Sequence, residues 1–228
     1  AGMVYAITKN YELSVEGFYK TMSNLIEYSE GASFFSASQN WEDKVVMGKG
    51  WSYGAEILLQ KKLGKFSGWI GYTLAWSQRK FPDLNFGKVF PYKYDRRHDI
   101  SIAGTYKFKE DFDAGLTWVF GTGNAVSLPV ESYMTTLSMQ PYSGMGGIEY
   151  YNGRGGYRTP PYHRLDLGFN FHKQKKYWKR TWSFGVYNAY NRQNPFFLFF
   201  GHDDKGNVVL KQFSLFPIIP FVRYSFKF

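Results

Sequence analysis

The sequence predicts an all-β protein, an antiparallel transmembrane meander of about nine strands in a bacterial outer membrane. Aromatic residues make up 21% of the 228 residues, and in segment after segment they alternate with polar residues. Such alternation is typical of strands that face lipid on one side and water on the other. Tight turns and long connections also alternate along the chain. No run reaches the roughly 18 to 20 apolar residues of a spanning helix.

Composition narrows the class of protein further. Mean hydropathy is −0.40 and 20% of residues are charged, values that a barrel also reaches because its lipid-facing and lumen-facing residues average out. The absence of cysteine excludes disulfide scaffolds, thiolate metal sites and cysteine nucleophiles. The net charge of +10 comes from scattered cations, and the densest run, 173–180, lies between two strand patterns. We therefore expect a polar turn there and no nucleic-acid partner.

The first strands are assigned from their apolar faces. The segment 3–8 is a short strand that ends at a Lys9-Asn10 turn. Three further strands follow, at 11–28, 51–62 and 66–77. Their apolar faces consist of Leu13, Val15 and Tyr19 in the first, Trp51, Tyr53, Ile57 and Leu59 in the second, and Phe66, Ile70, Tyr72, Leu74 and Trp76 in the third.

The later strands follow the same rule until the chain nears its end. Strands 98–108, 112–120 and 164–172 show strict alternation, whereas 182–200 and 208–228 exceed the roughly 9 to 11 residues that cross a bilayer. We expect these two to project beyond the membrane on the outer side. The apolar residues of the three regular strands are Ile100, Ile102, Tyr106 and Phe108; Leu116, Trp118 and Phe120; and Leu165, Leu167, Phe169 and Phe171.

The carboxyl-terminal strand alternates most strictly. Val222, Tyr224, Phe226 and Phe228 share one face. A slip of one residue would turn Arg223 into hydrocarbon at a cost of about 2 to 4 kcal/mol, so this register is strongly specified.

Proline interrupts the start of the same strand. Pro217 and Pro220 predict a bulge or bend before the regular alternation begins, because proline removes a ladder hydrogen bond.

The lengths of the connections predict how the meander is oriented. Antiparallel strands place alternate connections on opposite sides of the sheet, so all short turns share one side. Short periplasmic turns and long extracellular loops are typical of outer-membrane barrels, which places Phe228 at the periplasmic rim. The short turns are 9–10, 63–65, 109–111 and 173–180, and the long connections are 29–50, 78–97, 121–163 and 201–207.

Four motifs carry a resemblance to a known family. They are Tyr94-Asp95-Arg96-Arg97-His98-Asp99, the segment 118–126, the segment 187–192 and the terminal 224–228. Together they resemble TonB-dependent outer-membrane receptors. The resemblance implies that residues 1–228 form the carboxyl-terminal part of a 22-stranded barrel. An odd count near nine agrees with this, because single-chain bacterial barrels normally have an even number of strands. The signal peptide, the plug domain and the earlier strands are then expected outside this chain.

The resemblance implies active uptake of a scarce nutrient, such as a metal chelate, cobalamin, a glycan or a peptide. It implies as partners the plug and remaining strands, the TonB–ExbB–ExbD complex acting through the plug, and outer-membrane lipid and lipopolysaccharide. A surface lipoprotein is a further candidate partner. It also implies that the barrel assembly machinery reads Tyr224, Phe226 and Phe228, and it implies no cofactor. Two other classes stay open: a small passive pore or adhesin barrel, and an outer-membrane hydrolase.

Candidate ligand-binding residues lie in the connection 121–163, where tyrosines stand among many glycines. This composition suits adaptable recognition of a sugar, peptide or chelate by stacking and hydrogen bonding. The candidates are Tyr142, Tyr150, Tyr151, Arg154 and Tyr157.

Three charged residues before and within the strand 98–108 share the lumen-facing parity. Asp95, Arg97 and Asp99 are expected to form an ion-pair network along the barrel wall rather than a ligand site, because inward charges usually pair.

Catalytic and metal-binding signatures are missing from the sequence. The four histidines are dispersed without the spacing of a zinc site, and no nucleophile elbow occurs. The segment 202–207 lacks the acidic ligands of a calcium loop and predicts a hairpin turn. We therefore expect neither an enzyme nor a metal site.

Overall fold

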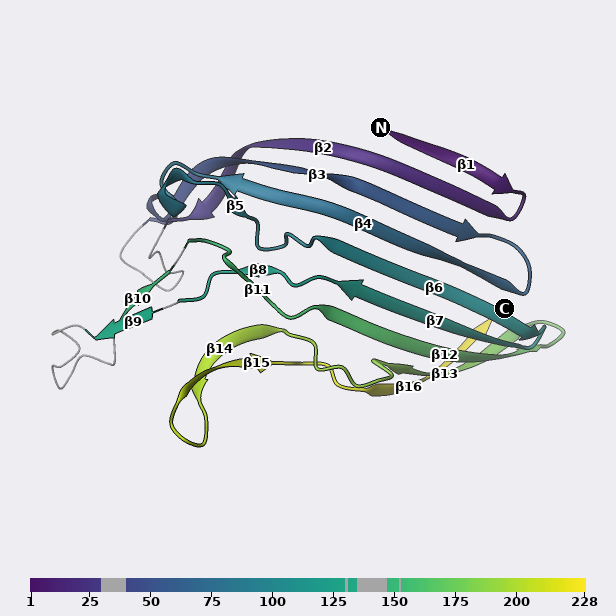
Figure 1. The fold of residues 1–228 in the computed structure, drawn as a ribbon. Coiled ribbons are helices and arrows are strands. Elements are labelled where there is room, and N and C mark those ends of the chain that lie inside the picture. Colours follow the sequence, from purple (N-terminus) through teal and green to yellow (C-terminus); the bar gives the residue numbers. More distant parts are fainter. Residues whose placement is uncertain (30–39, 130, 135–146, 152) are drawn as a thin grey trace.

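The structure, a computed structural model, describes residues 1–29, 40–129, 131–134, 147–151 and 153–228. Strands dominate it (Figure 1), and the two short 3₁₀ helices are η1 (Trp41–Lys44) and η2 (Asn85–Gly87). None of the helices in the described ranges is long and apolar enough to cross a membrane. The strands are β1 (Gly2–Thr8), β2 (Tyr11–Tyr28), β3 (Val45–Lys61), β4 (Phe66–Lys80), β5 (Phe90–Pro91), β6 (His98–Lys109), β7 (Phe112–Gly121), β8 (Ala125–Val126), β9 (Glu131–Met134), β10 (Gly147–Tyr150), β11 (Tyr157–Arg158), β12 (Tyr162–Gln174), β13 (Lys179–Tyr187), β14 (Phe197–His202), β15 (Val208–Phe213) and β16 (Ile219–Lys227).

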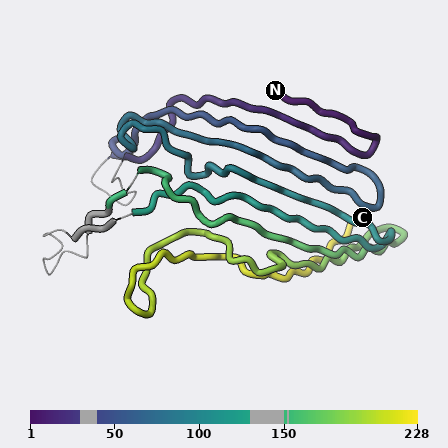
Figure 2. The backbone as a smooth tube through the Cα atoms, in the orientation of Figure 1, coloured from purple at the N-terminus to yellow at the C-terminus, as the bar shows by residue number. Residues whose placement is uncertain are grey.

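The main sheet is a meander in chain order. Its path is β1-β2-β3-β4-β6-β7-β12-β13-β16, with β5 added beside β4, and every pair on this path is antiparallel. The tight turns lie at one end of the sheet and the long connections at the other, and the carboxyl terminus lies at the tight-turn end (Figures 1 and 2). This arrangement confirms the predicted all-β antiparallel fold.

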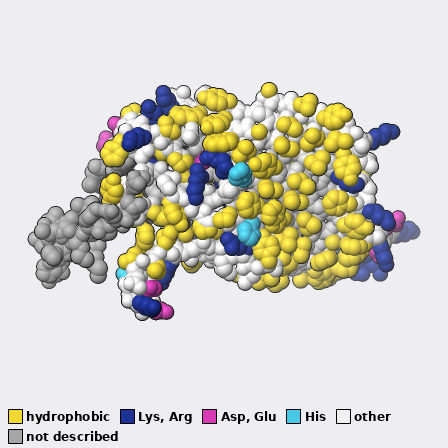
Figure 3. Space-filling view, in the orientation of Figure 1, with side chains coloured by type: hydrophobic (Ala, Val, Ile, Leu, Met, Phe, Trp, Pro, Cys, Tyr) yellow, Lys and Arg dark blue, Asp and Glu magenta, His cyan; other side chains and the backbone are white. Residues whose placement is uncertain are grey.

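Strand register separates the sheet into an apolar and a polar face. The row Leu59, Ile70, Ile102, Trp118 and Leu165 runs across five neighbouring strands through directly paired residues. Figure 3 shows apolar side chains gathered over the strands on one face, with lysine and arginine at the tight-turn end. The period of two places every second residue on this face, as the sequence predicts.

The opposite face is polar. Glu16, Glu56, Thr73 and Asp99 form one cross-strand row on it. A strand that alternates between lipid and an aqueous lumen needs such a face. We therefore call the apolar side the outer face and the polar side the lumenal face.

In the part of the chain that the structure describes, large buried apolar side chains lie only at the loop end of the sheet. Among the described residues, the buried apolar side chains are Phe81, Leu84, Phe90 and Ala125, and none of them belongs to the nine long strands. By contrast, apolar residues in mid-strand stay open, as with Ile70 at 46% exposure. A water-soluble sheet buries one face against another layer, so this distribution fits a sheet whose outer face meets lipid.

The end of the chain differs from the sequence prediction. The expected long strands 182–200 and 208–228 are each interrupted, and β14 and β15 pair only with each other among the described residues. Backbone geometry explains the first break, because Asn188 and Asn191 adopt φ of 55° and 54°, which lie outside the extended region of a regular strand. The second break spans Pro217, where the sequence predicts a bend.

The connection between the last two barrel strands is therefore 188–218, with β14 and β15 as a separate hairpin. The segment 201–207, expected as the whole connection, is only the tip of this hairpin. Periodicity alone could not reveal this, because the hairpin strands are short, mostly apolar runs whose pattern does not say which partner they pair with.

Other strand ends differ from the predicted ones by a few residues. β3 begins at Val45 rather than Trp51, because residues 45–50 continue the ladder with β2. β13 begins at Lys179 rather than Trp182, because the polar residues 179–181 continue the ladder past the membrane-facing segment. The long connection 121–163 contains the short strands β8, β9, β10 and β11.

Candidate functional site

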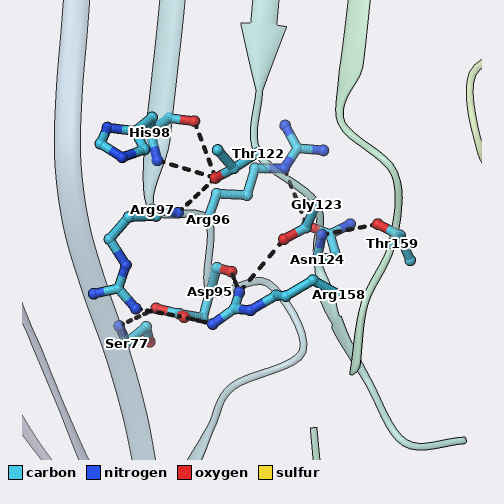
Figure 4. Close-up of polar contacts among 10 residues, drawn as sticks. All are labelled: Ser77, Asp95, Arg96, Arg97, His98, Thr122, Gly123, Asn124, Arg158 and Thr159. Atoms are coloured by element: carbon cyan, nitrogen blue, oxygen red, sulfur yellow. Dashed lines mark hydrogen bonds and ion pairs between the residues drawn. The ribbon is translucent and has the colours of Figure 1, made fainter. Parts of the chain in front are cut away.

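A buried carboxylate anchors the loops at the outer end of the sheet. Asp95 is 2% exposed, although it lies in the connection before β6. Its Oδ1 accepts the backbone N–H of Ser77 at 2.6 Å, and its Oδ2 pairs with Arg97 at 3.3 Å and with Arg158 (Figure 4). Arg158 also donates to the backbone carbonyl of Asp95. A buried carboxylate is stable only with such partners, so Asp95 ties three chain segments together.

The Gly-Thr-Gly-Asn motif after β7 meets the Asp-Arg-Arg-His motif before β6. Thr122 Oγ1 accepts the backbone N–H groups of Arg97 and His98 at 2.8 and 3.0 Å. Arg96 Nε donates to Asn124 Oδ1 at 3.0 Å. The two motifs singled out in the sequence therefore hold each other.

Glycine is required at the centre of this contact. A Cβ on Gly123 would overlap the carbonyl oxygen of Thr159, so the two backbones touch directly. Thr159 also exchanges hydrogen bonds with Asn124, through its hydroxyl at 2.9 Å and its N–H at 3.0 Å. We call this whole set the loop clasp; it comprises Ser77, Asp95, Arg96, Arg97, His98, Thr122, Gly123, Asn124, Arg158 and Thr159 (Figure 4).

A cavity of about 620 Å³ lies among the loops that the clasp holds. We call it the vestibule pocket. Three aromatic rings and one guanidinium contribute to its wall, and it is lined by Asn85, Phe86, Ser127, Tyr150, Tyr151, Gly153 and Arg154.

Hydrogen bonds between two connections shape this pocket. The N–H of Arg154 donates to Asn85 Oδ1 at 2.9 Å, and the N–H of Gly155 donates to Ser127 Oγ at 2.9 Å. The Arg154 guanidinium lies 5.8 Å from the ring centroid of Phe90 and 3.4 Å from the carbonyl oxygen of Tyr28. Residues of the connection 81–97 thus form one wall of the pocket, and Ser127, Tyr150, Tyr151, Gly153 and Arg154 form the other.

The wall of the vestibule pocket that η2 forms contains a strained turn. Asn85, Phe86 and Gly87 have φ of 52°, 55° and 68°, so three consecutive residues are left-handed. A bulky residue there costs about 1 to 3 kcal/mol. The turn is held by the buried cluster of Phe81, Leu84 and Phe90 beneath it. Phe86 itself is 91% exposed, so this strain presents an aromatic ring to solvent at the pocket.

The comparisons with known proteins decide the family. Residues 1–189 match the sequence model of the family described as TonB dependent receptor-like, beta-barrel. The chain belongs to this family. A search of curated proteins finds no match.

One similar solved structure is the ferric-catecholate import receptor Fiu from E. coli K12. It shares 15% identity with this chain at a TM-score of 0.52, and the match covers 99% of this chain. The likeness shows the barrel fold, and the chain spans 26% of that receptor's length.

The receptor barrel brings together three of the five candidate ligand-binding residues. Tyr150, Tyr151 and Arg154 line the vestibule pocket. Tyr157 lies in β11, paired with Val126, and is not part of the lining. Tyr142 falls outside the described residues. A role of the three lining residues in ligand binding stays a prediction.

Sequence reasoning missed the opposite wall of the pocket. Asn85 and Phe86 lie in the connection 78–97, where no ligand-binding residue was predicted. The Asn-Phe-Gly triplet was the available signal, because Asn and Gly favour left-handed turns.

The expected ion-pair network is rearranged in the receptor barrel. Asp95 and Arg97 do pair, but Asp99 lies opposite Arg96 at 3.5 Å instead of joining them. The prediction assumed that residues 95–97 alternate between two faces as in a strand, but β6 begins only at His98. Arg158 is the partner that the sequence did not indicate.

A second polar network crosses the lumenal face near the tight turns. Asp113 accepts a hydrogen bond from Asn170 at 2.8 Å and contacts His172, whose other ring nitrogen lies 2.8 Å from Thr181 Oγ1. These residues come from β7, β12 and β13, so the network fastens three neighbouring strands. Within the described ranges, no group of three or more His, Asp or Glu side chains is placed to hold a metal ion.

Proposed function

We propose that this chain is the carboxyl-terminal part of the barrel of a TonB-dependent receptor that takes up a scarce nutrient across the outer membrane. Family membership over 1–189 and the division of the sheet into outer and lumenal faces support this. In this proposal the plug and earlier strands complete the barrel, and the TonB–ExbB–ExbD complex pulls on the plug. The assembly machinery reads Tyr224, Phe226 and Phe228, and lipopolysaccharide surrounds the outer face.

The vestibule pocket is the observation that carries the proposed ligand contact. It lies at the end of the sheet with the long connections, which an outer-membrane barrel turns toward the exterior. Its volume of about 620 Å³ is within the range of roughly 300 to 1,000 Å³ that suits small-molecule ligands. Aromatic rings beside a guanidinium favour a ring-bearing, oxygen-rich solute. A metal chelate with anionic groups fits these groups best, and an oligosaccharide is the second candidate because it also stacks on aromatic rings.

The test uses the full-length receptor in its native host. Phe86→Ala and Tyr151→Ala each remove a ring from the pocket, and we expect roughly three- to tenfold weaker binding of the transported solute, from about 0.5 to 1.5 kcal/mol per ring contact. The matched control is Tyr177→Ala, which removes a 75% exposed ring from the turn at the opposite end of the sheet.

A panel of ferric chelates, cobalamin, oligosaccharides and peptides identifies the solute class by growth on each as the limiting source. Loss of growth without TonB separates an active receptor from a passive pore or adhesin. Equal affinities in wild type, both pocket variants and the control would contradict the proposed ligand contact.

A further inference from the structure

A second cavity lies at the base of the β14–β15 hairpin. This hairpin extends beyond the end of β13 and the start of β16 (Figure 1). The cavity has a volume of about 220 Å³. We call it the phenol cavity, because two tyrosines contribute to its wall from the start of β12 and the end of β13. It is lined by Tyr162, Tyr187, Asn194, Pro195, Phe196, Leu215 and Phe216.

Arg164 organises both tyrosines from the lumenal face. Its Nη1 donates to the hydroxyl of Tyr162 at 2.8 Å and to that of Tyr187 at 2.6 Å. Its Nε and Nη2 each lie 3.0 Å from Oδ2 of Asp166. The guanidinium is therefore neutralised by Asp166, and it contacts the phenols as a donor.

This arrangement leaves a hydrogen-bond donor without an internal acceptor. Each phenol oxygen accepts a hydrogen bond from Arg164, so each O–H proton points elsewhere. The two hydroxyls can use only one proton to bond each other. At least one O–H of Tyr162 or Tyr187 is therefore available to an acceptor from outside the chain, because the hydrogen bonds within the described part of the chain supply none. Donation from a charged group also polarises a hydroxyl and strengthens its own donation.

The rest of the lining is mainly aromatic and apolar, so few other polar groups compete with the phenols for a ligand. The Asn194 amide is occupied by the backbone of His163, accepting its N–H at 3.0 Å and donating to its carbonyl at 2.9 Å. Phe216 meets the ring of Tyr187 edge-on at 6.3 Å between centroids. The Asn194 amide keeps one further N–H, so the polar side-chain groups left to the cavity are this N–H and a phenol donor beside aromatic walls.

We propose that the phenol cavity binds a single ring that carries a carboxylate or another oxyanion. The ring packs among Phe196, Leu215 and Phe216, and the oxyanion accepts from the hydroxyls of Tyr162 and Tyr187. The volume is below the roughly 300 Å³ at which pockets hold complete small-molecule ligands, so the cavity takes one ring-bearing group. This inference goes beyond the proposed uptake, since it concerns a recognition site separate from the vestibule pocket.

The test is a ¹⁹F NMR titration of 4-fluorobenzoate into the full-length receptor in detergent. We expect saturable binding that weakens at least tenfold in the double variant Tyr162→Phe/Tyr187→Phe, because a hydrogen bond to a charged acceptor is lost. Fluorobenzene, which lacks the acceptor, should bind equally weakly to both proteins. Tyr190→Phe is the matched control, since it removes a phenol hydroxyl that bonds His163 outside the cavity.

A second variant keeps the tyrosines intact. Leu215→Trp fills the cavity and should abolish fluorobenzoate binding in a protein that retains heat-modifiable migration on gels. Absence of saturable binding to wild type, or equal affinity in the double variant, would overturn the proposal. The titration requires no transport, so a failure of the proposed uptake leaves its outcome unaffected.

Discussion

Replacing Asp95 with asparagine tests whether the loop clasp depends on its buried charge. The substitution keeps the side-chain size and an acceptor for the N–H of Ser77, but it removes the negative charge. The Asp95 side chain is 1% exposed, whereas Arg97 and Arg158 are 30% and 40% exposed. Asp95→Asn therefore leaves two cations facing a neutral amide in a largely dry site.

Removing one partner of a buried ion pair costs about 3 to 5 kcal/mol. Water reaches both arginines, so we expect the lower end, about 3 kcal/mol. The nine-stranded ladder does not depend on this contact, and the loss should appear as local opening of the loops. At about 1.4 kcal/mol per tenfold change, hydrogen exchange should accelerate roughly 100-fold. The amides to follow are those of Ser77, Arg97, His98 and Thr122.

Asp99→Asn is the matched control for this measurement. Asp99 belongs to the same motif and pairs with Arg96 at 3.5 Å, but the two side chains are 44% and 38% exposed. Exposed pairs contribute about 0 to 1 kcal/mol, so exchange should change less than about fivefold. If Asp95→Asn and Asp99→Asn accelerate exchange equally, the buried charge of Asp95 does not hold the loops.

Three further predictions concern the backbone contact, the membrane register and the hairpin tip. Gly123→Ala should destabilise the loop clasp by about 1 to 3 kcal/mol, because the new Cβ overlaps a backbone carbonyl. Gly168→Ala should be tolerated, because no atom lies within 4 Å of its new Cβ. Hydrogen exchange of the clasp amides compares the two variants. Leu167→Arg should lower the free energy of unfolding in lipid by about 2 to 4 kcal/mol, measured by denaturant titration. Gly168→Arg, at the next residue and on the lumenal face, should lower it much less. Equal losses in the two variants would refute the assigned faces. At the hairpin tip, hydrogen bonds from Asn207 hold the pKa of Asp203 below its usual value. The turn is therefore fully ordered at pH values above the ordinary pKa of aspartate, and it loosens as the pH falls through the lowered pKa of Asp203. NMR titration of the Asp203 carboxyl should show a higher pKa in Asn207→Ala, and an unchanged value would refute this cause.

Much of the sheet follows from local pattern. Leu165, Leu167, Phe169 and Phe171 alternate with polar residues, and the structure places all four on the outer face in β12. Period-two alternation and tight turns involve residues close in the chain, so a single sequence is enough to predict them. The same locality explains the error at the chain end, where the pattern could not say which sheet the hairpin strands join.

The candidate site was predictable only in part. Glycine and tyrosine content indicated the connection that contains Tyr151 and Arg154, because composition is a property of one segment. Phe86 was not predicted, because its importance comes from a facing loop and from backbone strain that composition does not show.

The sequence by itself determined most of the long strands, their two faces and the side of the sheet that bears the tight turns, because all three depend on neighbouring residues. Only the tertiary structure decided which loops meet. Asp95 pairs with Arg158, which lies 63 residues away in the sequence. Asn85 accepts a hydrogen bond from the backbone N–H of Arg154, which lies 69 residues away. The path of each long connection sets these contacts, and no repeating pattern in the chain specifies that path. The loop clasp, the vestibule pocket and the phenol cavity all arise from this long-range packing.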